Sequence, residues 1–166
     1  GILWCGEDGF YYDFDINNNR FSKVKSVASF LPVFSGVCDE EQCRELVSHL
    51  ENPDEFGTEF PVPSISKSDK TFGSDMWRGP VWINYNYMIS KGLDEYGDRL
   101  LSQKINKKTL SVISEWYDRT GTVYEFYDSQ NRTPPFCFNR KGAVVEPYDF
   151  RVKYQSIRDY GWTSTL

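Results

Sequence analysis

Residues 75–87 read Asp-Met-Trp-Arg-Gly-Pro-Val-Trp-Ile-Asn-Tyr-Asn-Tyr and join a predicted loop to a predicted helix. Gly79 and Pro80 are typical of a helix entry, because proline already has the backbone angle of a first helical turn. The residues that follow have helical spacing as far as about Tyr96. Before the stretch, residues 56–72 hold prolines and serines without periodicity, which predicts a long loop of the kind that often carries function.

Two more helices are predicted on the N-terminal side of this stretch. Apolar residues recur at helical spacing from Val24 to Phe34, although Pro32 is expected to end or kink that helix. Asp39 is expected to cap the second helix together with Gln42, and Asn52-Pro53 is expected to stop it. Before both of them, residues 6–19 read as turns around a short extended piece.

Towards the C-terminus, a helix is predicted from about Asp98 to Asp118, with Gly121 closing it. Gly92 or Gly97 is placed to end the helix before it, and a new helix is expected to start at residues 161–164. The expected buried side of the long helix comprises Leu101, Ile105, Ile113, Trp116 and Tyr117. Helices separated by long aromatic loops predict helical hairpins whose loops gather at one end to make a site.

Composition leaves two readings of the aromatic residues open. The chain has 166 residues, enough for one domain or for a part of a larger one. Aromatic residues make up 17% of it, which is high for a globular protein. The rings build either a large aromatic core or a cleft that stacks on the apolar faces of sugars.

Several classes of partner are excluded by charge and by residue type. The net charge is -5 without clustered Lys or Arg, so nucleic acid is not expected as a partner. No apolar run is long enough to span a bilayer, and the compartment is left open. Cys5, Cys38, Cys43 and Cys137 lack the paired spacing of a zinc site, and His49 is the only histidine. We expect no metal and no cofactor, with Cys38 and Cys43 as small buried residues rather than a disulfide.

The catalytic side chains that remain are carboxylates. His49 lies on a predicted amphipathic helix and is expected to be structural, so serine or cysteine catalysis is not indicated. Phosphate-binding glycine motifs are absent from the sequence. Carboxylates combined with Arg and Trp suit glycoside hydrolysis, which places two carboxyl groups across a glycosidic bond.

Residues 75–87 also resemble the Trp-Arg-Gly-Pro-x-Trp segment of glycoside hydrolase family 63 and its relatives, which include bacterial α-glucosidases, mannosylglycerate hydrolases and, more distantly, trehalases. Five further blocks resemble the same family in the same order. They are Tyr11-Tyr12-Asp13-Phe14-Asp15, Ser29-Phe30-Leu31-Pro32, Pro61-Val62-Pro63-Ser64, Tyr124-Glu125-Phe126-Tyr127 and Tyr160-Gly161-Trp162-Thr163-Ser164.

The resemblance implies an all-α fold with long loops and minor short strands, namely the C-terminal part of an (α/α)6 barrel. Twelve helices and their loops need roughly 300 residues or more, so residues 1–166 are expected to form the C-terminal portion of a single catalytic domain. The N-terminal half of that domain is the expected partner. By the same resemblance, it holds the Asp that acts as general acid.

The resemblance also implies that Glu125 is the general base of an inverting enzyme that hydrolyses α-glucosides or related α-glycosides. Glu125 would activate a water molecule opposite the leaving group. The structural alternative is that Glu125 only caps or pairs within a loop. Glu146 is the rival base, and Asp75 is a weaker candidate for the acid.

The expected substrate is an oligosaccharide or a small glycoside. Arg78 suits vicinal hydroxyls or a substrate carboxylate, with an inner-helix salt bridge as the alternative. By the resemblance, the helices of the barrel leave a funnel whose loops form the sugar site. Trp77 and Trp162 are expected in this funnel, while Trp82 is equally compatible with a core position. The predicted substrate-binding residues are Trp77, Arg78, Gly79, Trp82, Tyr124, Tyr127 and Trp162. Of Asn84 and Asn86, only one can face the site.

Two departures from the family and two rival functions stay open. Asn131 stands where a glycine is usual, and it can adopt the left-handed conformation needed there. Residues 134–159 form an unusual insert.

A noncatalytic carbohydrate-binding module would use the same rings and predicts mainly strand. A helical interaction scaffold predicts that no sugar binds.

Overall fold

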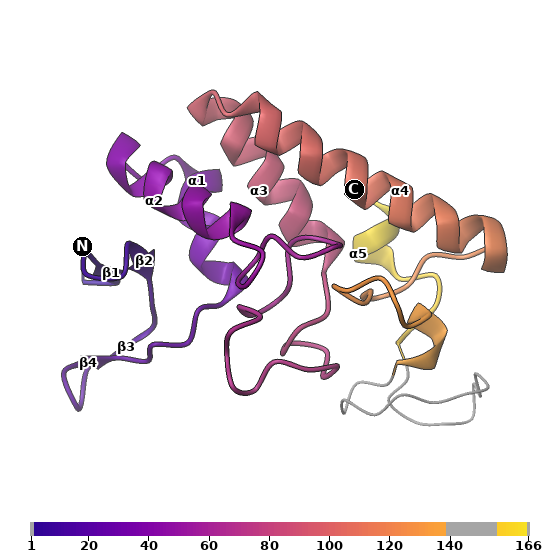
Figure 1. The fold of residues 1–166 in the computed structure, drawn as a ribbon, viewed down its shortest axis with the longest axis horizontal. Coiled ribbons are helices and arrows are strands. Elements are labelled where there is room, and N and C mark those ends of the chain that lie inside the picture. Colours follow the sequence, from indigo (N-terminus) through magenta and orange to yellow (C-terminus); the bar gives the residue numbers. More distant parts are fainter. Residues whose placement is uncertain (1, 139–155, 166) are drawn as a thin grey trace.

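A computed structural model describes residues 2–138 and 156–165, and its architecture is helical with a few short strands. Helices α3 (Ile83–Tyr96) and α4 (Arg99–Thr120) pack against each other as an antiparallel hairpin, and α1 (Leu31–Ser35) packs against α3 (Figure 1). Helix α2 (Glu40–Glu51) lies on the N-terminal side, and the short α5 (Gly161–Ser164) contacts α3. The predicted all-α class with minor strands is confirmed. None of the described helices is both long and apolar enough to cross a bilayer.

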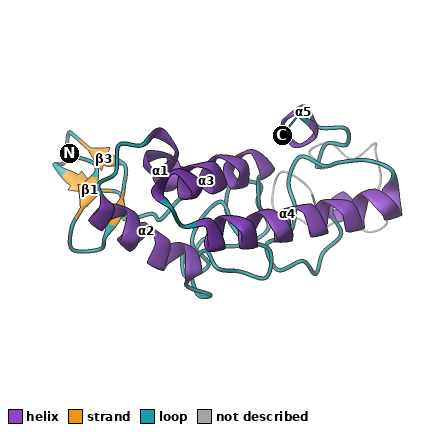
Figure 2. Ribbon diagram, turned by 90° about the horizontal axis from the view of Figure 1, so that it is seen from above, coloured by secondary structure: helices purple, strands orange, loops and turns teal. Residues whose placement is uncertain are grey.

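The strands form two small antiparallel hairpins near the N-terminus. Strand β1 (Trp4–Cys5) pairs with β2 (Phe10–Tyr11), and β3 (Phe14–Asp15) pairs with β4 (Arg20–Phe21). Figure 2 shows these strands gathered at the end of the molecule opposite α5. This confirms the expected turns and extended pieces before the first helix.

Helix α2 begins and ends as its sequence predicts. The Asp39 side chain accepts a hydrogen bond from the backbone N–H of Gln42, and the Gln42 side chain accepts one from the N–H of Asp39. This reciprocal capping satisfies two N–H groups that have no partner inside the helix. Cys43, Leu46 and Leu50 are buried on its inner face. As expected, Cys38 and Cys43 are buried free thiols.

The prediction for Pro32 is wrong. A 3-10 turn (Val27–Phe30) leads into α1, and Pro32 lies in the first turn of α1 rather than at the end of a helix. A proline is tolerated there because a first-turn N–H needs no helical partner. Gly36, in the left-handed conformation, ends the helix instead.

In the α3–α4 hairpin, Gly97 ends α3 and Asp98 caps α4, whereas Gly92 lies inside α3. A Cβ atom on Gly92 would lie 2.7 Å from the backbone of Val33 and Phe34, so this glycine lets α1 pack closely against α3. On α4 the predicted buried side is correct for Leu101, Ile105 and Trp116, and Ile113 is half-buried. Tyr117 is a wrong prediction, because its place on the helix turns it to solvent with 53% of its surface exposed.

Candidate active site

The long loops before α3 and after α4 are joined by single β-bridges. Pro63 pairs with Val81, Val81 pairs with Tyr127, and Tyr124 pairs with Arg158, all antiparallel. Backbone hydrogen bonds run both ways between Val81 and Tyr127, at 2.8 and 3.1 Å. Four blocks that are far apart in the sequence, at residues 61–64, 77–82, 124–127 and 156–164, are thereby brought together. The expectation that the loops gather at one place is confirmed.

Gly79 is held where no other residue fits. Its backbone N–H donates to the Ser64 hydroxyl at 2.9 Å, and the Ser64 N–H donates to the carbonyl of Pro80 at 3.1 Å. Its φ angle is +141°, and a Cβ atom there would lie 2.0 Å from the carbonyl oxygen of Gly73. The position therefore requires glycine for both its conformation and its space.

The two tryptophans of the stretch stack on one another. The rings of Trp77 and Trp82 lie 4.0 Å apart between centroids at an interplanar angle of 5°. Trp82 is buried, and its Nε1–H donates to the carbonyl of Met76 at 2.6 Å, whereas Trp77 is 36% exposed. Trp162 and Tyr160 approach the Trp82 ring at 5.9 and 6.2 Å. We call Trp77, Trp82, Tyr160 and Trp162 the aromatic wall.

Glu125 is buried within this assembly, with 2% of its surface exposed. Its backbone N–H donates to the carbonyl of Ile157 at 2.9 Å, and its Oε2 lies 3.4 Å from the backbone N–H of Ile157, which donates to it. The next residue, Phe126, packs against Trp82 at 5.5 Å between ring centroids. The carboxylate therefore belongs to a segment fixed on one side by Val81 and on the other by residues 157–159.

Tyr124 and Tyr127, which flank Glu125 and Phe126, are also buried, since each is 1% exposed. The Tyr127 hydroxyl accepts a hydrogen bond from the backbone N–H of Tyr124 at 3.0 Å. Burial raises the pKa of Tyr127 to about 12, which keeps the phenol neutral at physiological pH. Both rings pack in an apolar cluster with Phe60 and Trp116.

The choice that the sequence left open between Asn84 and Asn86 is decided by hydrogen bonding. Asn86 is fully buried; its side chain donates to the carbonyl of Pro61 at 2.7 Å and accepts from the N–H of Val62 at 3.1 Å. Asn86 thus holds the loop and does not face the site. Asn86 stands three and seven residues before the buried Ile89 and Leu93, which places it on the same buried face of the helix. This spacing is the sequence signal for its role. The Asn84 Oδ1 atom is buried and has no hydrogen-bond partner among the described residues.

Three further residues singled out in the sequence are Arg78, Asn131 and Glu146. Arg78 is exposed, and its backbone N–H donates to the carbonyl of half-buried Asp75 at 2.7 Å. Asn131 adopts the left-handed conformation, with φ +49°, that was expected at this departure from the family. Glu146 lies outside the described residues, as does most of the 134–159 insert.

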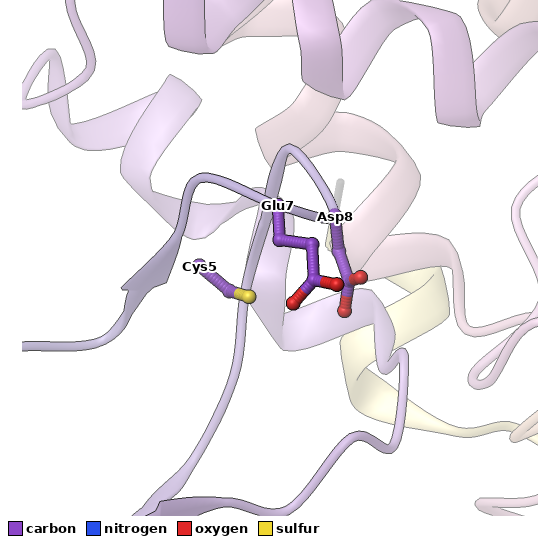
Figure 3. Close-up of side chains that lie close together, drawn as sticks. All are labelled: Cys5, Glu7 and Asp8. Carbon is purple, nitrogen blue, oxygen red and sulfur yellow. The ribbon is translucent and has the colours of Figure 1, made fainter.

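One group of potential metal ligands occurs among the described residues, well away from Glu125 in the sequence. Figure 3 shows Cys5, Glu7 and Asp8 with their donor atoms close together, all within 4.8 Å. The Lys23 ammonium lies 2.7 Å from Asp8 Oδ2 and 3.3 Å from Cys5 Sγ. The hydrogen bond from Lys23 lowers the pKa of Asp8. A side-chain cation therefore already contacts two of the three members of this group, Cys5 and Asp8.

Comparison with known proteins identifies the fold. Residues 1–163 match the profile described as the mannosylglycerate hydrolase MGH1-like glycoside hydrolase domain. The chain belongs to this family. The resemblance to glycoside hydrolase family 63 and its relatives, drawn from the sequence blocks, is thereby confirmed.

Individual relatives agree with this membership of the MGH1-like family. A mannosylglycerate hydrolase of Thermus thermophilus is 32% identical over 127 residues, which are 76% of this chain and 29% of the relative. The structure of a GH63 mannosylglycerate hydrolase from Thermus thermophilus, in complex with Tris, is 28% identical with a TM-score of 0.72, over 99% of this chain and 34% of that one. A probable mannosyl-oligosaccharide glucosidase of Schizosaccharomyces pombe is 29% identical over 98% of this MGH1-like chain and 19% of the relative.

The MGH1-like chain spans between about a fifth and about a third of the length of the relatives it matches. Its helical hairpin and gathered loops form part of an (α/α)6 barrel. The expected fold class is therefore confirmed.

Proposed function

We propose that this MGH1-like chain supplies the general-base part of an inverting glycoside hydrolase that acts on small α-glycosides. The observation that carries the proposal is the position of Glu125, a buried carboxylate in a segment that pairs with the Trp77–Trp82 stretch. We further propose that residues 1–166 are the C-terminal portion of the catalytic domain of a longer protein, here named the parent enzyme. Its N-terminal half would hold the general acid Asp.

The proposed reaction requires Glu125 to take a proton from water. That water attacks the anomeric carbon on the face opposite the leaving group, while the acid protonates the departing oxygen, so the configuration inverts. The backbone N–H of Ile157 would hold Oε2, fixing the orientation of the carboxylate. A general base works only within hydrogen-bond reach of the proton it accepts, so this orientation matters.

Substrate contacts are assigned from exposure. Trp77, Arg78 and Trp162 are exposed, and we propose that they contact the sugar directly, with Arg78 bonding to hydroxyls or to a substrate carboxylate. The buried members of the set would support these residues from beneath; they are Gly79, Trp82, Tyr124 and Tyr127. The names of the relatives favour a glucoside or a mannosylglycerate as substrate.

The test replaces Glu125 by Gln in the parent enzyme, with exposed Glu95→Gln on α3 as the matched control. We expect kcat to fall by roughly 100- to 10,000-fold for Glu125→Gln and to stay unchanged for the control. NMR of the first sugar released from an α-glycoside should show the β-anomer. Wild-type turnover by Glu125→Gln would show that Glu125 is not the general base, and release of the α-anomer would refute inversion.

The rival functions make different predictions. A noncatalytic carbohydrate-binding module predicts mainly strand, whereas the regular secondary structure of the described residues is chiefly helical. A helical scaffold predicts that Arg78→Ala changes no sugar affinity. We expect instead that Arg78→Ala raises KM at unchanged thermal stability, because its side chain is exposed.

A further inference from the structure

The peptide group that leads into Glu125 is fixed at both of its polar atoms. The carbonyl of Tyr124 accepts a hydrogen bond from the Thr163 hydroxyl at 2.7 Å, and the N–H of Glu125 donates to the carbonyl of Ile157 at 2.9 Å. Both partners come from the same C-terminal segment, more than 30 residues later in the chain. The plane of this peptide determines the direction in which the Glu125 side chain leaves the backbone.

Thr163 bonds differently from the hydroxyl residues beside it. Ser164 and Thr165 donate to the carbonyl of Gly161, which is the local pattern usual for hydroxyls in a helix. Thr163 is buried, with 7% of its surface exposed, and reaches a carbonyl 39 residues earlier. Local helix chemistry therefore does not account for its hydrogen bond.

The short helix α5 is itself well anchored. The backbone N–H groups of Thr163 and Ser164 both donate to the carbonyl of Tyr160 at 3.1 Å, and α5 packs against α3. Trp162, the residue before Thr163, belongs to the aromatic wall. One turn of helix thus carries an exposed aromatic ring on one side and the donor to Tyr124 on the other.

We propose that Thr163 is a positioning residue for Glu125, and this inference rests on the proposed role of Glu125 as general base. Without the hydroxyl, the buried carbonyl of Tyr124 loses the donor that fixes it, and the peptide before Glu125 is free to tilt. A small displacement of a catalytic group weakens the reaction step much more than it weakens binding. Loss of the hydroxyl should therefore lower kcat and leave KM nearly unchanged.

The experiment compares Thr163→Val, which loses the hydroxyl, with Thr163→Ser, which keeps it, in the parent enzyme. We expect kcat to fall about 10-fold for Thr163→Val with KM within about twofold, and to return to within about twofold of wild type for Thr163→Ser. Thr165→Val is the matched control, since its hydroxyl bonds only within α5. It should keep wild-type kcat.

Thermal melting shows that each variant is folded at the assay temperature. Thr163→Ala replaces Thr163→Val if the added methyl group prevents folding, and the same loss of kcat is expected. Wild-type kcat in a folded variant without the hydroxyl overturns the inference, as does an equal loss of kcat in Thr163→Ser. If Glu125→Gln is inactive while Thr163→Val is unaffected, only the positioning role fails. Wild-type turnover by Glu125→Gln would instead refute the proposed function itself.

Discussion

Two buried glutamates, Glu55 and Glu125, lie in different parts of the molecule and are held in different ways. Glu55 is 8% exposed; its carboxylate forms an ion pair with Lys25 and a hydrogen bond with Nδ1 of His49. The other ring nitrogen of His49 lies 3.0 Å from the carbonyl of Asp8, so this group ties the N-terminal hairpin to α2. Glu125, at 2% exposed, accepts a hydrogen bond from the backbone N–H of Ile157, and the next residue, Phe126, packs against Trp82 of the aromatic wall.

The comparison shows that burial alone does not mark a catalytic carboxylate. Burial raises the pKa of Glu55, but hydrogen bonds from Lys25 and His49 outweigh it and hold the pKa below its usual value. A carboxylate that is paired with a lysine and hydrogen-bonded to a histidine is a poor proton acceptor and a good structural link. At Glu125 the contact from Ile157 comes from a backbone N–H, a group that orients a carboxylate without carrying a full charge.

The largest expected effect is a change in kcat, and substitutions of the two glutamates should affect kcat and stability in opposite ways. Glu125→Gln should lower kcat of the parent enzyme by roughly 100- to 10,000-fold and leave its thermal stability near that of wild type. Glu55→Gln should do the opposite, lowering stability with kcat unchanged. Steady-state kinetics and thermal melting of both variants test this. Loss of kcat in a stably folded Glu55→Gln variant would break the distinction.

Gly79→Ala should lower the free energy of unfolding by about 3 kcal/mol or more. The new Cβ would clash with the Gly73 carbonyl, and the backbone conformation at this position is strained for any residue but glycine. Gly121→Ala is the matched control. Gly121 also has a positive φ, of +68°, but nothing lies within 4 Å of its added Cβ. We expect the control to lose only about 1 kcal/mol in urea denaturation. Equal losses would show that space around Gly79 is not the constraint.

Glu55→Gln should cost about 2 kcal/mol at pH 7, because a charge-assisted pair of hydrogen bonds is weakened. The folded-state pKa of Glu55 is lowered, so its contribution is complete above the unfolded value of about 4.3 and is lost as pH falls through the folded value. The difference in unfolding free energy between wild type and variant should therefore shrink below about pH 4. A difference that stays constant from pH 7 to pH 3 would contradict this account.

The smallest effect concerns the aromatic wall. Trp162→Ala should raise KM about fivefold, equivalent to roughly 1 kcal/mol of lost ring stacking, with little change in stability. Tyr117→Ala on α4 is the control, because Tyr117 is 53% exposed and Trp162 is 51% exposed. Its KM should stay at the wild-type value. If both variants raise KM equally, exposure rather than place in the wall explains the result.

Local sequence signals predicted the helices well. The Asp39–Gln42 cap, Asp98 and Gly121 act on backbone groups within four residues, so sequence spacing is sufficient to place them. Pro32 was misassigned because a proline can either start or end a helix, and its packing environment decides between these. Tyr117 was misassigned because it adjoins the buried stripe through Trp116 but points out of it.

The candidate site was only partly predictable. The sequence predicted that the long loops gather at one end, and the β-bridge between Val81 and Tyr127 joins the loop before α3 to the loop after α4. The sequence showed no preference between a core position and a funnel position for Trp82. The structure buries it beneath Trp77, because the stacking of these rings and the bond to Met76 depend on the fold of the loop before α3.

The sequence by itself determined the helical class, most helix ends and the family, because periodicity, caps and motif blocks are properties of neighbouring residues. Only the tertiary structure decided that Asn86 clamps a loop, that Glu55 lies between Lys25 and His49, and that Thr163 reaches Tyr124. These contacts join residues up to 39 positions apart. Their partners are chosen by packing between segments, which no local pattern records.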